Sequence, residues 1–262
     1  MLGVQINSMV HSPGKDLWTY EKRNVCSFDG TDDYCVSDFF DDIEGSSSWT
    51  ISFWINIASI PPLTALCFHH GDAIYSNPPF FQVGFNSSGG VRYFKISNWH
   101  GTGADVLSEG DHSLDFDESK DHDRWIHVFF RWDKDIDSGK IQYMLDACGT
   151  ITSSSQADTN VVPAMGGSEA QQRLAIGGYY VSGLGSLAGI EGKMADVAIW
   201  RSRLGDQEAY MLASGVSPLD IEATTLNHFW KLSGSGEDDG SATTRDEADL
   251  TAVNDADIGA AL

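Results

Sequence analysis

The stretch DRWIHVFFRWDKDIDSGKIQYMLDACG, residues 123–149, has the strongest β-sheet pattern around a turn. Two runs rich in β-branched and aromatic residues, Trp125–Trp132 and Lys140–Leu145, flank a polar turn at Asp133–Gly139. Such runs suit a pleated sheet, and the Asp, Ser and Gly residues between them reverse the chain. Bulky side chains occupy both alternation sets of the first run, which predicts a strand covered on both faces. We therefore expect a β-hairpin at the centre of the fold.

The size and composition of the chain fit one globular domain. It has 262 residues, of which 41% are hydrophobic and 11% aromatic, enough for a sizeable core. No apolar run approaches the roughly 18 residues that a membrane-spanning helix needs. Residues 1–15 lack the basic start and apolar block of a secretory signal peptide. We expect neither a transmembrane segment nor a signal peptide.

The formal net charge of -22 is the unusual feature of the composition. Such a surface repels phosphate backbones and anionic lipids, which argues against nucleic-acid and membrane partners. It leaves many carboxylates available for divalent cations, although a solvated surface adapted to salt is the simpler interpretation.

The rest of the chain alternates short strands with polar turns. An arm is expected at residues 1–23, a body at 24–232 and an acidic tail at 233–262. Within the body, residues 99–123 read as a long acidic loop and 151–169 as a Ser/Thr/Gly-rich connection. One helix is expected, from Asp206 to about Ala213, and Asp206 can cap its N-terminus. The expected strands lie at 25–36 (a hairpin), 49–57, 63–69, 80–85, 91–97, 173–178, 192–200 and 226–232.

The strand at 49–57, WTISFWINI, has the cleanest alternation in the chain. Its apolar set would face the core. Trp54 belongs to the opposite, polar set, so it is either covered by another element or exposed for a purpose.

Seven segments follow one another in a characteristic order. They are FDGTDDYC (28–35), TISFWI (50–55), RWIHVFFRWD (124–133), GKIQYMLDA (139–147), LAIGG (174–178), GKMADVAIWRSRLGDQE (192–208) and LNHFWKL (226–232). In this order the chain resembles laminin-G-like jelly rolls of the concanavalin A-like lectin and glucanase superfamily, of the kind found in tailed-phage structural proteins. The resemblance covers roughly residues 24–232 and implies an all-β, two-sheet antiparallel jelly-roll sandwich with one short late helix.

The residues of a glycosidase are missing from this pattern. Glucanases of the superfamily carry two glutamates about an aspartate on one strand, and no E-x-D-x-E or E-x-D-x-x-E run occurs here. The strand at 192–200 holds a single carboxylate, Asp196. The histidines do not cluster in sequence, which disfavours zinc. We therefore expect a protein that is not an enzyme.

Calcium is the cofactor that the sequence could hold, though none is required. Two acidic stretches have the alternating oxygen spacing of a calcium loop, and laminin-G-like modules often bind one calcium at the sandwich rim. Lys120 stands where the first loop needs glycine, Gly139 comes one place late in the second, and neither has the final glutamate. A solvated loop and a hairpin turn are the simpler interpretations. The candidate ligands are Asp115, Asp117, Asp121, Asp133, Asp135 and Asp137.

A glycan site would need aromatic platforms on loops at one end of the sandwich. Trp99 and His100 before the acidic loop, and Tyr179 and Tyr180 after LAIGG, are the candidates. Anchoring of loops onto sheet edges explains these aromatic residues equally well.

The four cysteines are too few for a disulfide scaffold. A tight reversal at Gly30-Thr31 would place Cys26 opposite Cys35, so a disulfide between them is geometrically feasible. Two small buried thiols are the favoured alternative, because free cysteine is among the most buried residue types.

These features lead to a functional hypothesis. A lectin-like body without a secretion signal is expected on a virion surface, as a phage head decoration or fibre-associated protein that is released by lysis. Its partners would be other virion proteins, copies of itself and cell-surface glycans. The alternatives are a secreted or cell-surface carbohydrate-binding module and a divergent glycoside hydrolase.

Overall fold

The structure is a computed structural model in which thirteen segments can be described. Side chains are described for most of 25–37, 45–58, 123–145, 151–153, 174–178, 189–222 and 224–232, and only the backbone for the other described residues. The described backbone covers residues 24–39, 45–59, 65–70, 81–88, 91–100, 105–106, 123–145, 151–157, 173–178, 189–222, 224–232, 250–253 and 257–261. The predicted arm at 1–23 lies outside these residues.

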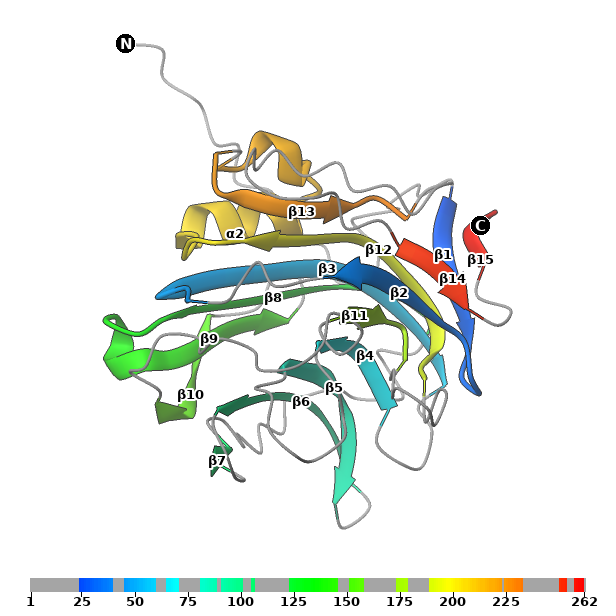
Figure 1. The fold of residues 1–262 in the computed structure, drawn as a ribbon, viewed down its shortest axis with the longest axis horizontal. Helices are drawn as coiled ribbons and strands as arrows, with labels where there is room; N and C mark the ends of the chain where they lie inside the picture. The colour runs from blue at the N-terminus through cyan, green and yellow to red at the C-terminus, as the bar shows by residue number, and fades with distance from the viewer. Residues whose placement is uncertain are drawn as a thin grey trace, which may run out of the picture.

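The described strands form two antiparallel sheets that make a sandwich (Figure 1). One sheet has the order β10 (Thr152–Ala157), β9 (Lys140–Leu145), β8 (Trp125–Asp133), β3 (Ser48–Ser59), β12 (Glu191–Trp200), β1 (Asn24–Asp29) and β15 (Asp257–Ala261), and β13 (Leu226–Trp230) also pairs with β12. The other has the order β14 (Leu250–Val253), β2 (Tyr34–Phe39), β11 (Arg173–Ile176), β4 (Ala65–His70), β5 (Phe81–Ser88), β6 (Val91–His100) and β7 (Asp105–Val106). The predicted two-sheet antiparallel architecture is confirmed.

The central hairpin is confirmed. Strands β8 and β9 pair in a register that sets Phe130 against Tyr143, and the short 3-10 helix η1 (Asp137–Gly139) turns the chain between them. Strand β8 lies between β3 and β9, and its residues 126–132 are buried. Its two alternation sets enter different clusters, so both faces of this strand are covered as predicted.

Side chains from both sheets meet in the main core. The core includes four large side chains that are almost fully buried, Trp49, Phe53, Phe130 and Trp132. Burial of each such side chain stabilises the fold by about 2–3 kcal/mol. The alternation of residues 49–57 therefore predicted the core face of β3 correctly.

A second cluster lies on the opposite face of the larger sheet. The predicted helix is α2 (Asp206–Ala213), and its Ala209 and Leu212 pack with Phe129, Trp200 and Phe229. The 3-10 helix η3 (Pro218–Asp220) follows α2, and the indole nitrogen of Trp200 donates to the carbonyl of Ile221. The late helix thus covers one part of this outer face.

Two predicted features need correction. Residues 25–36 are not one hairpin ladder, because β1 and β2 pair into different sheets and the turn between them is a corner of the sandwich. Residues 250–253 and 257–261, expected in a polar tail, form β14 against β2 and β15 against β1 (Figure 1). The sandwich therefore continues beyond residue 232.

Smaller differences concern the connections. Strand β10 occupies part of the segment expected to be a Ser/Thr/Gly-rich connection, and β7 lies within the expected acidic loop. Among the described residues no helix is long and apolar enough to cross a membrane.

Candidate functional site

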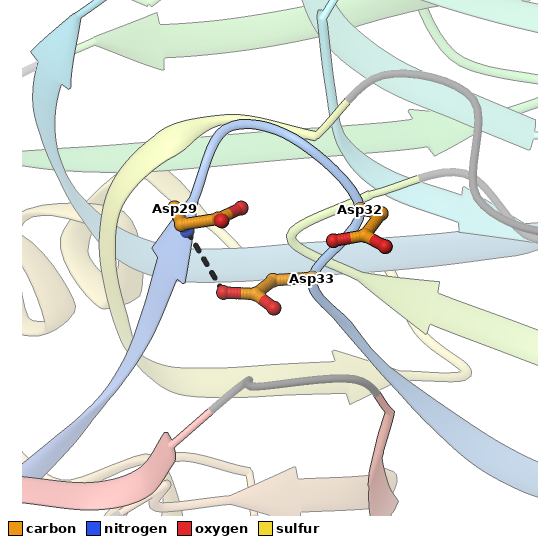
Figure 2. A group of neighbouring side chains, drawn as sticks. All are labelled: Asp29, Asp32 and Asp33. Carbon is orange, nitrogen blue, oxygen red and sulfur yellow. Dashed lines mark hydrogen bonds between the residues drawn. The ribbon is translucent and has the colours of Figure 1, made fainter.

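Three aspartates meet at the corner between β1 and β2 (Figure 2). Asp29 ends β1, and Asp32 and Asp33 precede β2. Each of these side chains places one carboxylate oxygen within 4.8 Å of the others. We call Asp29, Asp32 and Asp33 the carboxylate corner.

Local backbone hydrogen bonds shape this corner. The Asp29 Oδ1 atom accepts from the Thr31 amide at 2.7 Å, and the Asp33 Oδ2 atom accepts from the Asp29 amide at 2.9 Å. Gly30 has φ +80, and a Cβ there would lie 2.8 Å from the Cβ of Glu191. Glycine is thus needed both for the left-handed backbone and for the close approach of β12.

The donors of the carboxylate corner suit a hard cation. Calcium is bound by six to eight oxygen ligands at about 2.3–2.6 Å, whereas zinc prefers nitrogen and sulfur. Asp29 and Asp32 are exposed and could turn toward an ion, while Asp33 is 3% exposed and is held by its bond to the Asp29 amide. The corner can supply three carboxylates, and water would have to complete the coordination.

The sequence interpretation missed this cluster. The sequence signal that could have found it is the D-x-x-D-D spacing of FDGTDDY across a glycine turn, which brings three carboxylates within five residues of one reversal.

The second predicted calcium stretch forms the turn of the central hairpin. Asp133 accepts from the Asp135 amide at 2.9 Å, Asp135 pairs with Lys134, and Asp137 accepts from the Ser153 hydroxyl. These side chains have separate partners and do not form a three-ligand group. The arrangement favours the hairpin-turn interpretation, and calcium binding there stays a prediction. Asp115, Asp117 and Asp121 lie outside the described residues.

The strand register shows how the predicted glycan residues are distributed. Trp99 and His100 end β6, where they pair with Val106 and Asp105 of β7. Through β5 and β4, Asn98 of β6 is level with Leu174 in β11, so Trp99 is level with Arg173, the first residue of β11. Tyr179 and Tyr180 lie outside the described residues and follow the opposite end of β11. The end of β6 that carries Trp99 and His100 and the end of β11 that precedes Tyr179 and Tyr180 thus lie at different ends of the sheet. A glycan site at these four residues stays a prediction.

Asp196 is the most perturbed carboxylate among the described residues. It sits in a β-bulge of β12 with φ 47, between the part of the strand that pairs with β1 and the part that pairs with β13. Its side chain is 8% exposed. Burial raises the pKa of Asp196 to about 7, against the opposing charge of Lys231. Glycoside hydrolysis requires a pair of carboxylates, and Asp196 is the single carboxylate within residues 192–200.

The family of the chain follows from a family model described as the concanavalin A-like lectin/glucanases superfamily. This model, Laminin_G_3, matches residues 29–209, more than half of the chain. The chain belongs to this superfamily. The match begins within the carboxylate corner and ends in α2, so it spans the central hairpin. No curated protein sequence matches the chain.

Three solved structures are similar to this chain at low sequence identity. A proposed carbohydrate-binding protein from Bacteroides ovatus ATCC 8483 is 18% identical with a TM-score of 0.54, over 88% of this chain and 60% of that protein. The native heptameric SAP-like pentraxin from Limulus polyphemus is 14% identical with a TM-score of 0.48, over 75% of this chain and 84% of that one. The Ruminococcus gnavus IT-sialidase CBM40 bound to alpha2,6 sialyllactose is 13% identical with a TM-score of 0.46, over 73% of this chain and 97% of that one.

Proposed function

We propose that the protein is a carbohydrate-binding domain without hydrolytic activity. The observation that carries the proposal is the match of residues 29–209 to the superfamily model. The superfamily contains lectins as well as glucanases. The structural similarity to a proposed carbohydrate-binding protein agrees with it. Because a fold hosts many functions, the choice between binding and catalysis must come from the residues.

The residues favour binding over catalysis. Hydrolysis of a glycoside needs an acid and a nucleophile or base, held at about 5–9.5 Å from each other on the two sides of the bond. The sequence lacks the paired glutamates of the superfamily's glucanases. Asp196 of β12 is only 8% exposed and sits in a bulge at the start of the β12–β13 pairing, which argues against contact with a polysaccharide.

We further propose that calcium supports glycan binding through the carboxylate corner. A divalent ion would relieve the repulsion between three nearby carboxylates in a protein of net charge -22. It would also order a corner to which sugar hydroxyl groups could bind directly or through the ion. Asp32 is the best probe, because it is exposed and is not the acceptor of the two backbone hydrogen bonds that shape the corner, which Asp29 and Asp33 accept.

The test is affinity electrophoresis and calorimetry on a panel of soluble polysaccharides, with calcium and with EDTA. We expect retardation by at least one polysaccharide that weakens in EDTA, and calcium binding that falls at least tenfold in Asp32→Asn. The control is Asp220→Asn, which removes an exposed carboxylate of η3. Polysaccharide binding that ignores EDTA would retain the domain function and reject the calcium role. Release of reducing sugar from the same panel would overturn the proposal and show that the protein is a glycoside hydrolase.

A virion-surface location is a narrower proposal. It is supported by the resemblance to tailed-phage proteins and by the expected arm at residues 1–23. Light scattering at high salt tests it: a trimer or larger ring that dissociates when residues 1–20 are deleted would favour an assembled coat or fibre component. A monomer would leave the secreted or cell-surface module as the better description.

A further inference from the structure

We propose that Cys26 and Cys35 form a disulfide that joins the two sheets at the carboxylate corner. Cys26 lies in β1 of the larger sheet, and Cys35 lies in β2 of the other. Both side chains enter the core between the sheets. The bond would therefore cross the sandwich where the chain passes from one sheet to the other. This inference does not depend on the proposed glycan binding.

The geometry of the two thiols carries the proposal. Their Sγ atoms lie 3.0 Å apart, and both side chains are 0% exposed. A disulfide needs an S–S distance of about 2.05 Å, so closing the bond requires each sulfur to move by roughly 0.5 Å. Neighbouring strands hold both positions, since Cys26 pairs with Met194 and Cys35 pairs with Ile176.

A hydrogen bond between two thiols is the competing explanation. A buried thiol is a weak donor, and small buried cysteines are common without any bond between them. However, packing alone does not require two cysteines to face each other from different sheets. The expected hairpin at residues 25–36 would have placed both cysteines in one sheet. In the structure they face each other from different sheets.

The reaction is thiol–disulfide exchange with a small-molecule disulfide such as oxidised glutathione. The thiolate of one cysteine attacks the oxidant, forms a mixed disulfide and releases one small thiol. The second cysteine, as its thiolate, then attacks the protein sulfur of the mixed disulfide and releases the second small thiol. The two cysteines lose two electrons and two protons, and the oxidant becomes two thiols. Since both sulfurs are fully buried, we expect exchange before the sandwich closes or during opening of the corner.

The bond would have consequences for structure and location. It closes the loop of residues 26–35, which contains the whole carboxylate corner, and holds the base of that loop fixed. Structural disulfides persist in oxidising surroundings and are rare in the cytosol. A disulfide here therefore indicates that the folded protein is used outside a reducing cell interior.

Peptide mapping of the full chain tests the bond. The protein is refolded in a buffer of oxidised and reduced glutathione, blocked with iodoacetamide in denaturant without reductant, and cleaved with an Asp-specific protease. Cleavage before Asp16, Asp29, Asp33 and Asp38 releases residues 16–28 with Cys26 and residues 33–37 with Cys35. We expect these two peptides as one linked species, lighter by two hydrogens than their sum, while Cys67 and Cys148 are alkylated.

Thermal unfolding with and without dithiothreitol supplies the second measurement. Closing a loop of this length is expected to raise the Tm by about 5–10 °C, so reduction should lower the Tm by that amount. Cys35→Ala is the matched control, and its Tm should not respond to reductant. The Cys67→Ser/Cys148→Ser double variant, which keeps the proposed pair, should respond as the natural chain does. Alkylation of all four cysteines after refolding, or linkage through Cys67 or Cys148, would overturn the proposal.

Discussion

Replacement of Asp196 by asparagine should stabilise the protein at neutral pH and have a much smaller effect in acid. The carboxyl sits in the bulge of β12 at 8% exposure, and burial raises its pKa to about 7 from the ordinary 3.8. Lys231 opposes this shift through its positive charge. Asparagine keeps the size and hydrogen-bonding oxygen of the side chain and tolerates the left-handed backbone at φ 47.

The sign and size of the effect follow from proton linkage. The folded state binds the Asp196 proton more tightly than the unfolded state, so the free energy of unfolding falls as pH rises between about 4 and 7. At about 1.4 kcal/mol for each unit of pKa, the ionised carboxylate costs about 4 kcal/mol above pH 7. Asp196→Asn removes this cost, so its advantage should grow by about 1.4 kcal/mol per pH unit from pH 5 to pH 7. Above pH 7 the advantage should stay constant.

Urea unfolding followed by tryptophan fluorescence, at intervals from pH 5 to pH 8.5, measures this difference. The protein carries many other carboxylates, so the comparison needs a variant with the same change in net charge. Asp220→Asn serves, because Asp220 is exposed and the substitution makes the same change in net charge. A pH-independent difference for Asp196→Asn would refute the reasoning and show that the buried carboxyl ionises at its ordinary pKa.

Two further substitutions test the packing around the sheets. Arg131→Met should lower the free energy of unfolding by about 3 kcal/mol, since this buried side chain donates to Gln142, the Leu204 carbonyl and Asp206. Asp206→Asn should lower it by less than about 1 kcal/mol, because the Asp206 side chain is 69% exposed. Urea unfolding compares the two, and equal losses would contradict a role for the buried guanidinium beyond the ion pair. Gly177→Ala should lower the Tm by at least about 5 °C, because Gly177 has φ +83 and an added Cβ would overlap the Phe28 ring, and an unchanged Tm would contradict this close approach.

Much of the sandwich was predictable because its central strands repeat a simple pattern. In β3 the apolar set Trp49, Ile51, Phe53 and Ile55 enters the core, as the alternation requires. In β8 both sets are bulky, and the structure assigns them to two different clusters. Alternation reports which residues face a core, and these strands lie at the middle of the sheet, where the core is thickest.

Pairing between distant segments could not be derived in the same way. Residues 250–253 and 257–261 are two short segments within a polar, acidic stretch of sequence, so their pattern alone did not predict strands. They become strands because β2 and β1 offer them free edges at the two sheets. The corner between β1 and β2 was mistaken for a hairpin for the same reason: sheet membership is decided by contacts with β11 and β12, which come much later in the chain.

The candidate site was predicted less well than the fold. The hairpin-turn alternative at 133–137 and the cluster at 29–33 have similar acidic sequences. What separates them is that the carboxylates at 133–137 have separate partners, as Asp137 has in Ser153, whereas those at 29–33 lie close to one another. Ser153 belongs to β10, so the spacing within 133–137 could not reveal that Asp137 has this partner.

The burial of the larger sheet restricts where a ligand can bind. Trp54, predicted to be either covered or exposed for a purpose, is 5% exposed, and its ring lies 5.1 Å from the ring of His127. His127 in turn exchanges a hydrogen bond with the Ser52 hydroxyl at 2.8 Å, and both are buried. The polar set of β3 is therefore part of a second covered surface. Among the described residues, the exposed side chains occur at strand ends, in turns and on the helices, and the carboxylate corner is one of these places.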